Sequence, residues 1–329
     1  VHQLPACPHC QHDLSQQTAD KLVKRQVFDI PPLRLQVHEH QAQVKQCPCC
    51  GERSRADFPD NAKAPTQYGP NVLAHAAYLN SYHLIPVARV REWFVDCMGQ
   101  AVSEGTIARA VADLSEAVAP SLDVIYTGLT RSTVVHHDET GFRANAGLRW
   151  LHTACTEYLS YYNVHLKRGS EAMLDIGVLP NSRSWAVHDG LKGYFGFETV
   201  RHALCNAHHL RELQFADEQY QADWAKQLQK LLLKMKKHDD EQSLTQKRIR
   251  QLEAEYDDLI RQGFEAFPIQ PRPPDHKGSF AQHPVTNLLI RLRDHREAVL
   301  AFLHHPEVPF DNNLAERDLR MMKVKQKIS

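Results

Sequence analysis

The sequence has no long hydrophobic run, no export signal and no excess of charge of either sign. No apolar stretch approaches the ~18 residues that a membrane-spanning helix needs, so no transmembrane span is expected. The N-terminus lacks a basic segment followed by an apolar one, so export is not indicated and a cytoplasmic location is expected. A formal net charge of +0 argues mildly against a purely electrostatic nucleic-acid binder.

The chain has 329 residues, of which 42% are hydrophobic and 24% are charged. This suffices for two or three domains with a sizeable core. The sequence begins with Val1 rather than Met and stops at Ser329 without an obvious end, which predicts a fragment or an unusual start codon. Basic residues cluster within 224–237 and within 317–327. Each cluster is either a solvated helix face, the commoner case, or a set of phosphate contacts.

Two Cys-x-x-Cys pairs near the N-terminus predict a structural zinc site. Cys7 and Cys10 form the first pair, and Cys47 and Cys50 form the second. Four thiolates in this arrangement bind zinc tetrahedrally and leave no open position for chemistry. Cys49 is an additional thiol that could replace a neighbour as a ligand. Disulfide pairing or free thiols are less favoured, because the chain shows no export signal.

The residues between the two cysteine pairs are predicted to be β-rich, and the region after them helical. Residues 26–30 and 33–37 alternate like strands. After a linker over 58–70, apolar residues recur with helical spacing over 71–118, with a turn near Gly99. The two helices around this turn form either a helix-turn-helix that reads DNA or an ordinary helical spacer; periodicity does not separate the two.

Two aspartates follow short apolar runs and are candidates for catalysis. Asp138 is expected at the end of a buried strand that starts near Thr133 and is closed by a turn at Gly141, and Asp189 follows a strand over 183–188. Taken singly, an Asp shortly before Gly is most often a turn residue. The repetition favours function, since both aspartates follow similar strands and have a His just before them.

A third acid, Glu316, lies in the first turns of a predicted helix that begins near Asn313. Its simplest role is a favourable interaction with the helix dipole. Together with Asp138 and Asp189, however, it forms a set of carboxylates that can hold two Mg²⁺ or Mn²⁺ ions for phosphoryl transfer. Three crowded carboxylates would not all stay ionised without cations.

The residues around these acids predict a mixed α/β core. Strands are expected over 148–154 and 159–165, joined to the first strand by a hairpin turn over 143–147, and a short helix over 171–176. The 202–205 run is read as leading into a helix. This order suits a ribonuclease-H-like sheet with carboxylates at one edge.

Cys205 and His208 have CxxH spacing. Two ligands are too few for an independent zinc site, so packing and hydrogen bonding beneath the active site are favoured over metal binding, and we assign both residues a supporting role. Histidines crowd the same region; most are expected to be ordinary, and some to orient an Asp or move a proton. They are His136, His137, His188, His208 and His209.

Residues 217–263 are strongly helical and predict a hairpin of two long helices. Each helix has one apolar stripe, so the hairpin is expected to bury its own apolar stripes. The stripes are Leu228, Leu231 and Met235, and Ile249, Leu252, Tyr256 and Leu259. A Pro-rich extended linker follows over 267–274, and helix returns over 287–303.

Together these motifs resemble the bacterial DDE transposases of insertion-sequence family 66. The resemblance covers essentially the whole chain and rests on CPHC, CPCCG, VVHHDETG, VHDG, HALCNAHHLREL and DNNLAERDLRMMKVKQKIS. It implies a zinc-ribbon-like segment over 1–57 and a helical DNA-binding region over 65–128. It also implies a ribonuclease-H-like catalytic core over 129–216 and 285–329, interrupted by a helical insertion and linker over 217–284. Family members usually continue beyond both ends of this sequence.

The resemblance implies a chemistry as well. It assigns catalysis to Asp138, Asp189 and Glu316, with Mg²⁺ or Mn²⁺, and structural Zn²⁺ to the cysteine pairs. The implied activity is cleavage of transposon ends and strand transfer into target DNA, at the nucleoid of a bacterial cytoplasm. Double-stranded DNA is the implied partner, with a homo-oligomer as the active complex and accessory proteins of the same element. Two alternatives stay open: a DNA-binding regulatory protein with a degenerate core, and a ribonuclease-H-like nuclease that only hydrolyses.

Overall fold

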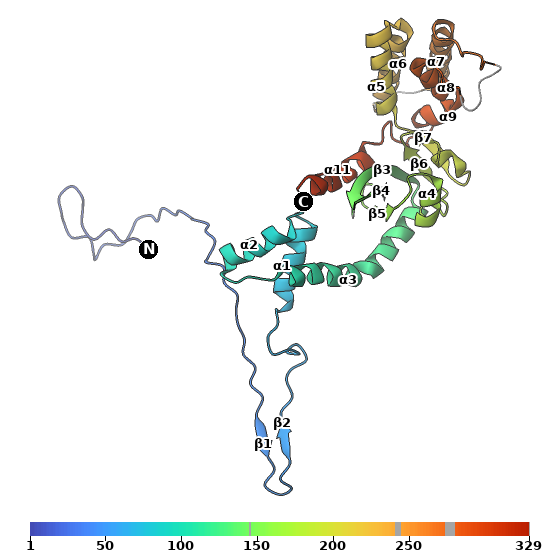
Figure 1. Cartoon of the computed structure of the whole chain (residues 1–329). Coiled ribbons are helices and arrows are strands. Elements are labelled where there is room, and N and C mark those ends of the chain that lie inside the picture. Colours follow the sequence, from blue (N-terminus) through green and yellow to red (C-terminus); the bar gives the residue numbers. More distant parts are fainter. Residues whose placement is uncertain (145, 241–244, 274–279, 329) are drawn as a thin grey trace. The chain divides into compact units, whose positions relative to one another are not determined.

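The computed structural model describes residues 1–144, 146–240, 245–273 and 280–328 (Figure 1). Its contacts divide the chain into two compact units. The first consists of Val1–Tyr68 and Ala88–Glu104, and the second of Gly69–Val87 and Gly105–Ser329. The second unit carries all three candidate acids, and the first carries both cysteine pairs.

The first unit has little regular structure before its helical part. Its strands β1 (Val44–Gln46) and β2 (Arg53–Arg55) form an antiparallel hairpin, and the second cysteine pair lies in the turn (Figure 1). The strands predicted within 26–37 are wrong, since these residues, all described, form no strand. Val27 and Phe28 are 90% and 91% exposed, so their alternation has neither a partner strand nor a core to stabilise it.

Helices begin at residue 70, as the sequence predicts. They are α1 (Pro70–Ser81), α2 (Val87–Met98) and α3 (Glu104–Arg131). Gly99 ends α2 with a φ of +71°, a conformation that glycine adopts without strain. Leu114 and Val118, two members of the stripe expected in α3, are 41% and 40% exposed, whereas Leu129 in its last turn is fully buried. The helix therefore continues beyond the predicted stripe and packs firmly only near its ends.

The second unit is built on a mixed sheet. In the described chain it has five strands in the order β5-β4-β3-β6-β7. They are β3 (Val134–Ala144), β4 (Gly147–Cys155), β5 (Ser160–His165), β6 (Trp185–His188) and β7 (Arg201–Leu204). Strands β3, β4 and β5 are antiparallel neighbours, and β6 and β7 extend the sheet parallel to β3. The predicted hairpin lies between β3 and β4, with residue 145 outside the described residues.

Two predictions about the sheet were wrong. First, β3 does not turn at Gly141, which pairs with Trp150 because the β3–β4 ladder continues beyond the end of β6. Asp138 therefore lies inside a long strand and not at its end. Second, the predicted order has four strands and misses a fifth, β7, which lies just before α5 (Asn206–Tyr220); four residues are too few for a strand pattern to stand out.

Helices cover both faces of the sheet. On one face, Leu129 of α3 packs with Val135, Ala154 and Val178, and this face also has α4 (Ser170–Ile176) and the 3₁₀ turn η1 (Tyr194–Gly196) near it. On the other face, α11 (Asn313–Ile328) contacts β3 and β4. Because side chains alternate along β3, His136 and Asp138 face α11, and His137 and Glu139 face the opposite layer.

The remaining helices follow β7. They are α5 (Asn206–Tyr220), α6 (Asp223–Asp240), α7 (Gln246–Ala266), α8 (Pro284–Asp294), α9 (Arg296–Val299) and α10 (Ala301–His304). The helix predicted over 287–303 is present but divided into α8, α9 and α10, because the backbone leaves helical geometry at His295 and Leu300. The predicted hairpin of two long helices exists as α6 and α7, which contact each other. No helix in the described ranges is long and apolar enough to span a lipid bilayer.

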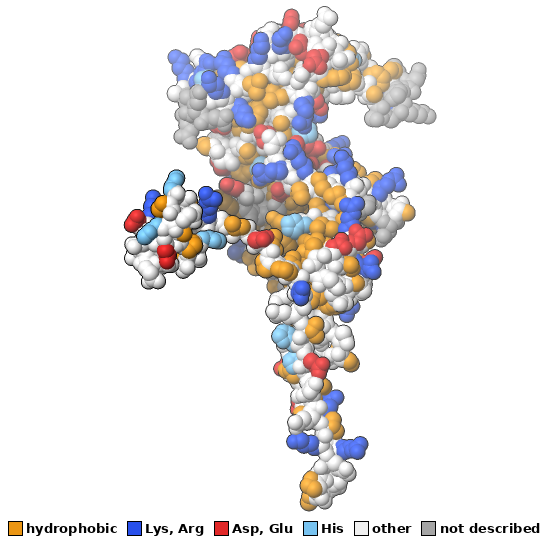
Figure 2. All heavy atoms as spheres, turned by 90° about the vertical axis from the view of Figure 1, so that its left-hand side faces the viewer, with side chains coloured by type: hydrophobic (Ala, Val, Ile, Leu, Met, Phe, Trp, Pro, Cys, Tyr) orange, Lys and Arg blue, Asp and Glu red, His pale blue; other side chains and the backbone are white. Residues whose placement is uncertain are grey.

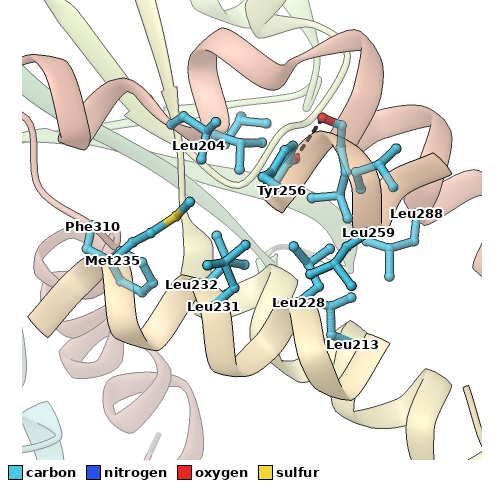
Figure 3. Packing of buried hydrophobic residues seen from close by; sticks show 14 of the residues in the cluster. Leu204, Leu213, Leu228, Leu231, Leu232, Met235, Tyr256, Leu259, Leu288 and Phe310 are labelled. Atoms are coloured by element: carbon cyan, nitrogen blue, oxygen red, sulfur yellow. Dashed lines mark hydrogen bonds between the residues drawn. The ribbon is translucent and has the colours of Figure 1, made fainter. Parts of the chain in front are cut away.

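The apolar stripes of the hairpin are buried as predicted, but not by the hairpin alone. Figure 3 shows Leu231 and Met235 of α6 and Tyr256 of α7 packed in one cluster with Leu204 of β7 and Leu288 of α8. The Tyr256 hydroxyl donates to the carbonyl of Leu292 at 2.9 Å. The helical insertion and the sheet therefore share one hydrophobic core.

The basic run within 224–237 is partly ion-paired. Figure 2 shows Lys and Arg side chains in separate groups interspersed with acidic ones on the face drawn. Lysines of the run lie near acids of α5, α7 and the segment before α11. The nitrogen–oxygen distances are 3.9 Å for Lys226–Asp217, 3.8 Å for Lys234–Glu255 and 3.8 Å for Lys236–Asp311. These contacts favour a solvated, charge-balanced face for this run.

Candidate active site

Parallel pairing of β3 with β6 brings two candidate acids to the same level of the sheet. The last pair in the ladder joins His136 to Val187. Continuing that register by two residues places Asp138 level with Asp189. The chain then turns at Gly190, whose φ of +91° strongly favours glycine. Strand β6 therefore ends directly before Asp189.

Backbone and side-chain groups orient both aspartates. Asp138 Oδ1 accepts the N–H of Glu139 at 2.8 Å, and Asp189 Oδ1 accepts the N–H of Leu191 at 2.9 Å. The guanidinium Nη2 of Arg168 lies 3.8 Å from Asp189 Oδ2. One carboxylate oxygen of each aspartate is therefore fixed by the backbone.

Asp138 has the most perturbed carboxyl group of the site. Burial is the main cause that raises its pKa to about 7, and the charges of Glu139, Asp189 and Glu316 raise it further. The backbone hydrogen bond to Asp138 acts in the opposite direction. The two other candidate acids are thus close enough to oppose ionisation of Asp138. Hard carboxylate oxygens that repel one another in this way are suitable ligands for Mg²⁺ or Mn²⁺.

Glu316 reaches the site from the first turn of α11. Its Oε1 lies 3.0 Å from His208 Nε2, on α5, and 3.8 Å from Arg211 Nη2 one turn further along that helix. The Glu316 side chain is 23% exposed, so it can still meet solvent or a ligand. Helix α5 therefore supplies two side chains that lie close to a carboxylate on α11, although the two helices are distant in sequence.

Asn312, the residue before α11, is almost completely buried at 1% exposure. Its side-chain oxygen lies 2.8 Å from His136 Nδ1, its amide nitrogen donates to the carbonyl of His137 at 2.8 Å, and its backbone N–H donates to Cys205 Sγ at 3.1 Å. In the structure Asn312 joins the start of α11 to β3 and to the start of α5.

Glu139 lies on the face of the sheet opposite Asp138, as the alternation of β3 predicts. Its carboxylate accepts bonds from Arg168 Nε at 2.9 Å and from the Tyr194 hydroxyl at 2.6 Å. Burial raises the pKa of Glu139, and these two bonds lower it. Arg168 therefore lies beside both Glu139 and Asp189. Nothing in the sequence signalled Arg168 or Tyr194, because both are distant from the acidic motifs.

Most histidines near the site are buried and uncharged. Burial lowers the pKa of His136, and lowers those of His137 and His209 to about 3. Burial also lowers the pKa of His188, whose Nε2 lies 3.0 Å from His202 Nδ1. His136, His188 and His209 make hydrogen bonds within the fold, whereas Nε2 of His137 has no hydrogen-bond partner among the described residues. His208 differs from them, because it contacts a candidate acid directly.

The Cys205 and His208 pair, expected only to support the site, lies at Glu316. Among the described residues, these three form the group of metal-binding side chains whose ligand atoms all lie within 4.8 Å of one another. Asp138 and Asp189 do not belong to that group. The CxxH pair therefore has the third ligand that the sequence alone did not supply.

The two cysteine pairs each have the local geometry of a metal-binding knuckle. The Gln11 N–H donates to the carbonyl of Cys7 at 2.8 Å, and the Gly51 N–H donates to that of Cys47 at 2.9 Å. The pKa of Cys7 is lowered chiefly by the backbone N–H of Cys10, and that of Cys47 by the N–H of Cys50. Backbone donors that stabilise the thiolate, with Cys-x-x-Cys spacing, fit zinc. No four-sulfur cluster is found among the described residues.

Two models of known protein families match the chain. Residues 65–329, which include all three candidate acids, match the model described as Transposase IS66 family. Residues 5–51, which include all four predicted zinc ligands, match the zinc-finger binding domain of transposase IS66. No curated protein matches the chain significantly. A class of DNA-acting enzymes with a structural zinc-binding segment is thereby defined. The chain belongs to the IS66 family of transposases.

Proposed function

We propose that this transposase is a DDE enzyme whose catalytic acids are Asp138, Asp189 and Glu316. The observation that carries the proposal is the β3–β6 register, which places Asp138 level with Asp189; burial and neighbouring acids that include Asp189 and Glu316 also raise the pKa of Asp138 to about 7. Perturbed carboxyl groups of this kind cluster at functional sites. Bound between these carboxylates, Mg²⁺ or Mn²⁺ would activate the attacking oxygen and stabilise the leaving oxygen.

The reaction we propose exchanges phosphodiester bonds in two steps. Water attacks the phosphorus at a transposon end, and the 3′ oxygen leaves as a hydroxyl. That hydroxyl then attacks a phosphodiester of the target DNA and releases a target 3′-hydroxyl. The chain's own contribution is to hold the carboxylates in place. Backbone N–H groups fix Asp138 and Asp189, and His208 orients Glu316.

The fold gives further support. Three antiparallel strands extended by two parallel ones, with acids level on neighbouring parallel strands, suit a ribonuclease-H-like core. We propose this core over 129–216 and 285–329, with 217–284 as its helical insertion. We also propose DNA binding by the helical region over 65–128, and zinc held by the cysteine pairs of the segment 1–57. Double-stranded DNA and a homo-oligomeric active complex, with accessory proteins of the same element, are the proposed partners, at the bacterial nucleoid.

The test is a pair of assays, one for cleavage of transposon ends and one for joining of a pre-cut end to target DNA. Asp138→Ala, Asp189→Ala and Glu316→Ala should each lower both rates by about a thousandfold or more, since a lost cation ligand removes several kcal/mol of transition-state stabilisation. DNA affinity should persist, because phosphate and base contacts lie elsewhere. Asp175→Ala, at an exposed acid of α4, is the matched control and should retain both activities.

The same assays separate the alternatives. Cleavage without joining would indicate a nuclease that only hydrolyses. DNA binding with neither reaction, in protein supplied with Mg²⁺ or Mn²⁺, would indicate a regulatory protein with a degenerate core. Full activity in any of the three variants would remove that residue from the catalytic set.

A further inference from the structure

The start of α5 and the start of α11 present three metal-binding side chains of different chemistry to one another. Cys205 precedes α5, and His208 lies three residues later, on the same side of the first turn. Glu316 comes from the first turn of α11. We propose that Cys205, His208 and Glu316 bind a thiophilic divalent cation such as Zn²⁺, and that this ion inhibits the enzyme by occupying Glu316. The inhibitory part rests on the proposed catalytic role of Glu316; the binding part does not.

The geometry suits a small tetrahedral ion. Zinc bonds of about 2.0–2.3 Å place neighbouring ligand atoms about 3.3–3.7 Å apart. In the structure, His208 Nε2 and Glu316 Oε1 are 3.0 Å apart, and all three ligand atoms lie within 4.8 Å of one another. Shifts of about 1 Å or less per side chain would complete the coordination. Three protein ligands would leave the fourth position open to water or to a phosphate oxygen.

The ligand set discriminates between cations. A thiolate and an imidazole favour zinc, cobalt or cadmium, whereas Mg²⁺ prefers oxygen ligands. The site supplies only one carboxylate, so it has little to offer Mg²⁺. The ion that fits Cys205 and His208 therefore differs from the one that Asp138 and Asp189 favour, and the two ions would compete for Glu316.

Some neighbouring groups favour cation binding at this site and others oppose it. Burial raises the pKa of the Cys205 thiol, which opposes loss of its proton, while backbone donors led by Asn312 lower it. The Asn312 N–H lies 3.1 Å from Sγ, in position to stabilise a thiolate. Arg211 lies 3.8 Å from Glu316 and would repel a cation, but its side chain is 60% exposed and can move into solvent. Coordination itself favours the deprotonated thiol.

The binding test uses the full chain loaded with one equivalent of Zn²⁺, which the N-terminal cysteine pairs take up first because they offer more thiolate ligands; unbound Zn²⁺ is then removed. Co²⁺ is then titrated, and both stoichiometry and the sulfur-to-cobalt charge-transfer absorption are recorded. One additional ion with thiolate absorption is expected. Cys205→Ser should abolish that absorption, and His208→Ala should weaken binding about tenfold or more. Cys155→Ser, which removes another buried thiol outside the cluster, is the matched control and should bind as the unsubstituted protein does.

Absence of the additional ion, or an unchanged spectrum in Cys205→Ser, would overturn the proposed site. The activity test adds Zn²⁺ to reactions supported by Mg²⁺. Half-inhibition should need about tenfold more Zn²⁺ in His208→Ala than in the unsubstituted protein, each measured against its own uninhibited rate. Cobalt binding without zinc inhibition would overturn the inhibitory part alone. Complete inactivity of the unsubstituted protein would count against the proposed catalytic function, while the cobalt titration would still decide the site.

Discussion

The side-chain oxygen of Asn312 lies 2.8 Å from Nδ1 of His136, joining the residue before α11 to the strand that carries Asp138. Burial lowers the pKa of His136, so the ring is neutral and the bond is one between uncharged groups. The amide nitrogen of Asn312 donates to the next carbonyl of the same strand, that of His137. The amide of Asn312 therefore helps to set the distance between β3 and the first turn of α11, and with it the position of Glu316.

Replacing Asn312 should loosen this connection. Asn312→Ala leaves the His137 carbonyl and the His136 ring without their partner in a buried setting, which should cost about 1–3 kcal/mol of unfolding free energy. Urea unfolding measures the loss. Asn313→Ala, at the exposed neighbouring position, should cost much less. Equal losses in the two variants would show that the Asn312 contacts do not matter.

The protonation of Asp138 should make stability depend on pH. Its pKa is about 7 in the folded protein against an ordinary value of 3.8 for an aspartate, so the folded state binds the proton more tightly. The stability associated with this group is fully present below about pH 4 and is lost as the pH rises through about 7. Asp138→Asn removes the titration. The free energy of unfolding of Asp138→Asn, relative to that of the unsubstituted protein, should increase between about pH 4 and pH 7. The increase should then level off at an amount on the order of a few kcal/mol.

Thermal or urea unfolding in metal-free buffer checks this dependence. Mg²⁺ added at pH 8 should stabilise the unsubstituted protein more than Asp138→Asn, since the carboxylate is then a ligand. Asp175→Asn, at an exposed acid, should show no comparable gain over this range. A constant difference between Asp138→Asn and the unsubstituted protein at all pH values would contradict the raised pKa.

The shared core predicts that the helical insertion does not unfold alone. Leu252 of α7 is fully buried, and Leu252→Ala should cost about 2–5 kcal/mol. Leu233→Ala on α6, at a position that is 48% exposed, should have a small effect. Trp185 of β6 and Trp224 of α6 both lie in this cluster, so tryptophan fluorescence and circular dichroism should show one coincident transition. Separate transitions would mean that the insertion has an independent core.

Zinc content should distinguish the cysteines of the N-terminal segment. Cys47→Ser should lower the bound zinc by about one ion per chain, because a four-thiolate site loses a ligand. Cys49→Ser should retain that zinc if Cys50 is the ligand. Elemental analysis after metal-replete expression measures both. The unfolding of the second unit should not change in either variant, because metal binding contributes its folding free energy locally. Equal zinc in Cys47→Ser and the unsubstituted protein would contradict the assignment.

The sequence predicted most elements of the second unit because their signals are local. Strands with continuous apolar runs, such as that over 185–188, and helices with a regular stripe, such as α7, are visible in single windows of sequence. The strands expected within 26–37 failed for the same reason. Alternation is a local pattern, but a strand needs a partner, and these residues have none in the described chain.

Contacts between distant segments could not be predicted. Asn312 meets His136 across 176 residues, and His208 meets Glu316 across 108. The CxxH pair lacked a visible third ligand. Arg168 had no motif at all. Sequence motifs therefore indicated candidate site residues more readily than the contacts that those residues make.

Helix α3 is continuous over 28 residues, which is about 42 Å of helix. Its last turn places Leu129 against Val135, three residues before Asp138 in the same strand. A helix is stiff along its axis, so a displacement of the first turns will be transmitted to the strand of the active site unless it is absorbed at Pro120, inside the helix. Pro120, which lacks a backbone N–H to donate within the helix, is therefore a position at which α3 can bend between its first turns and β3.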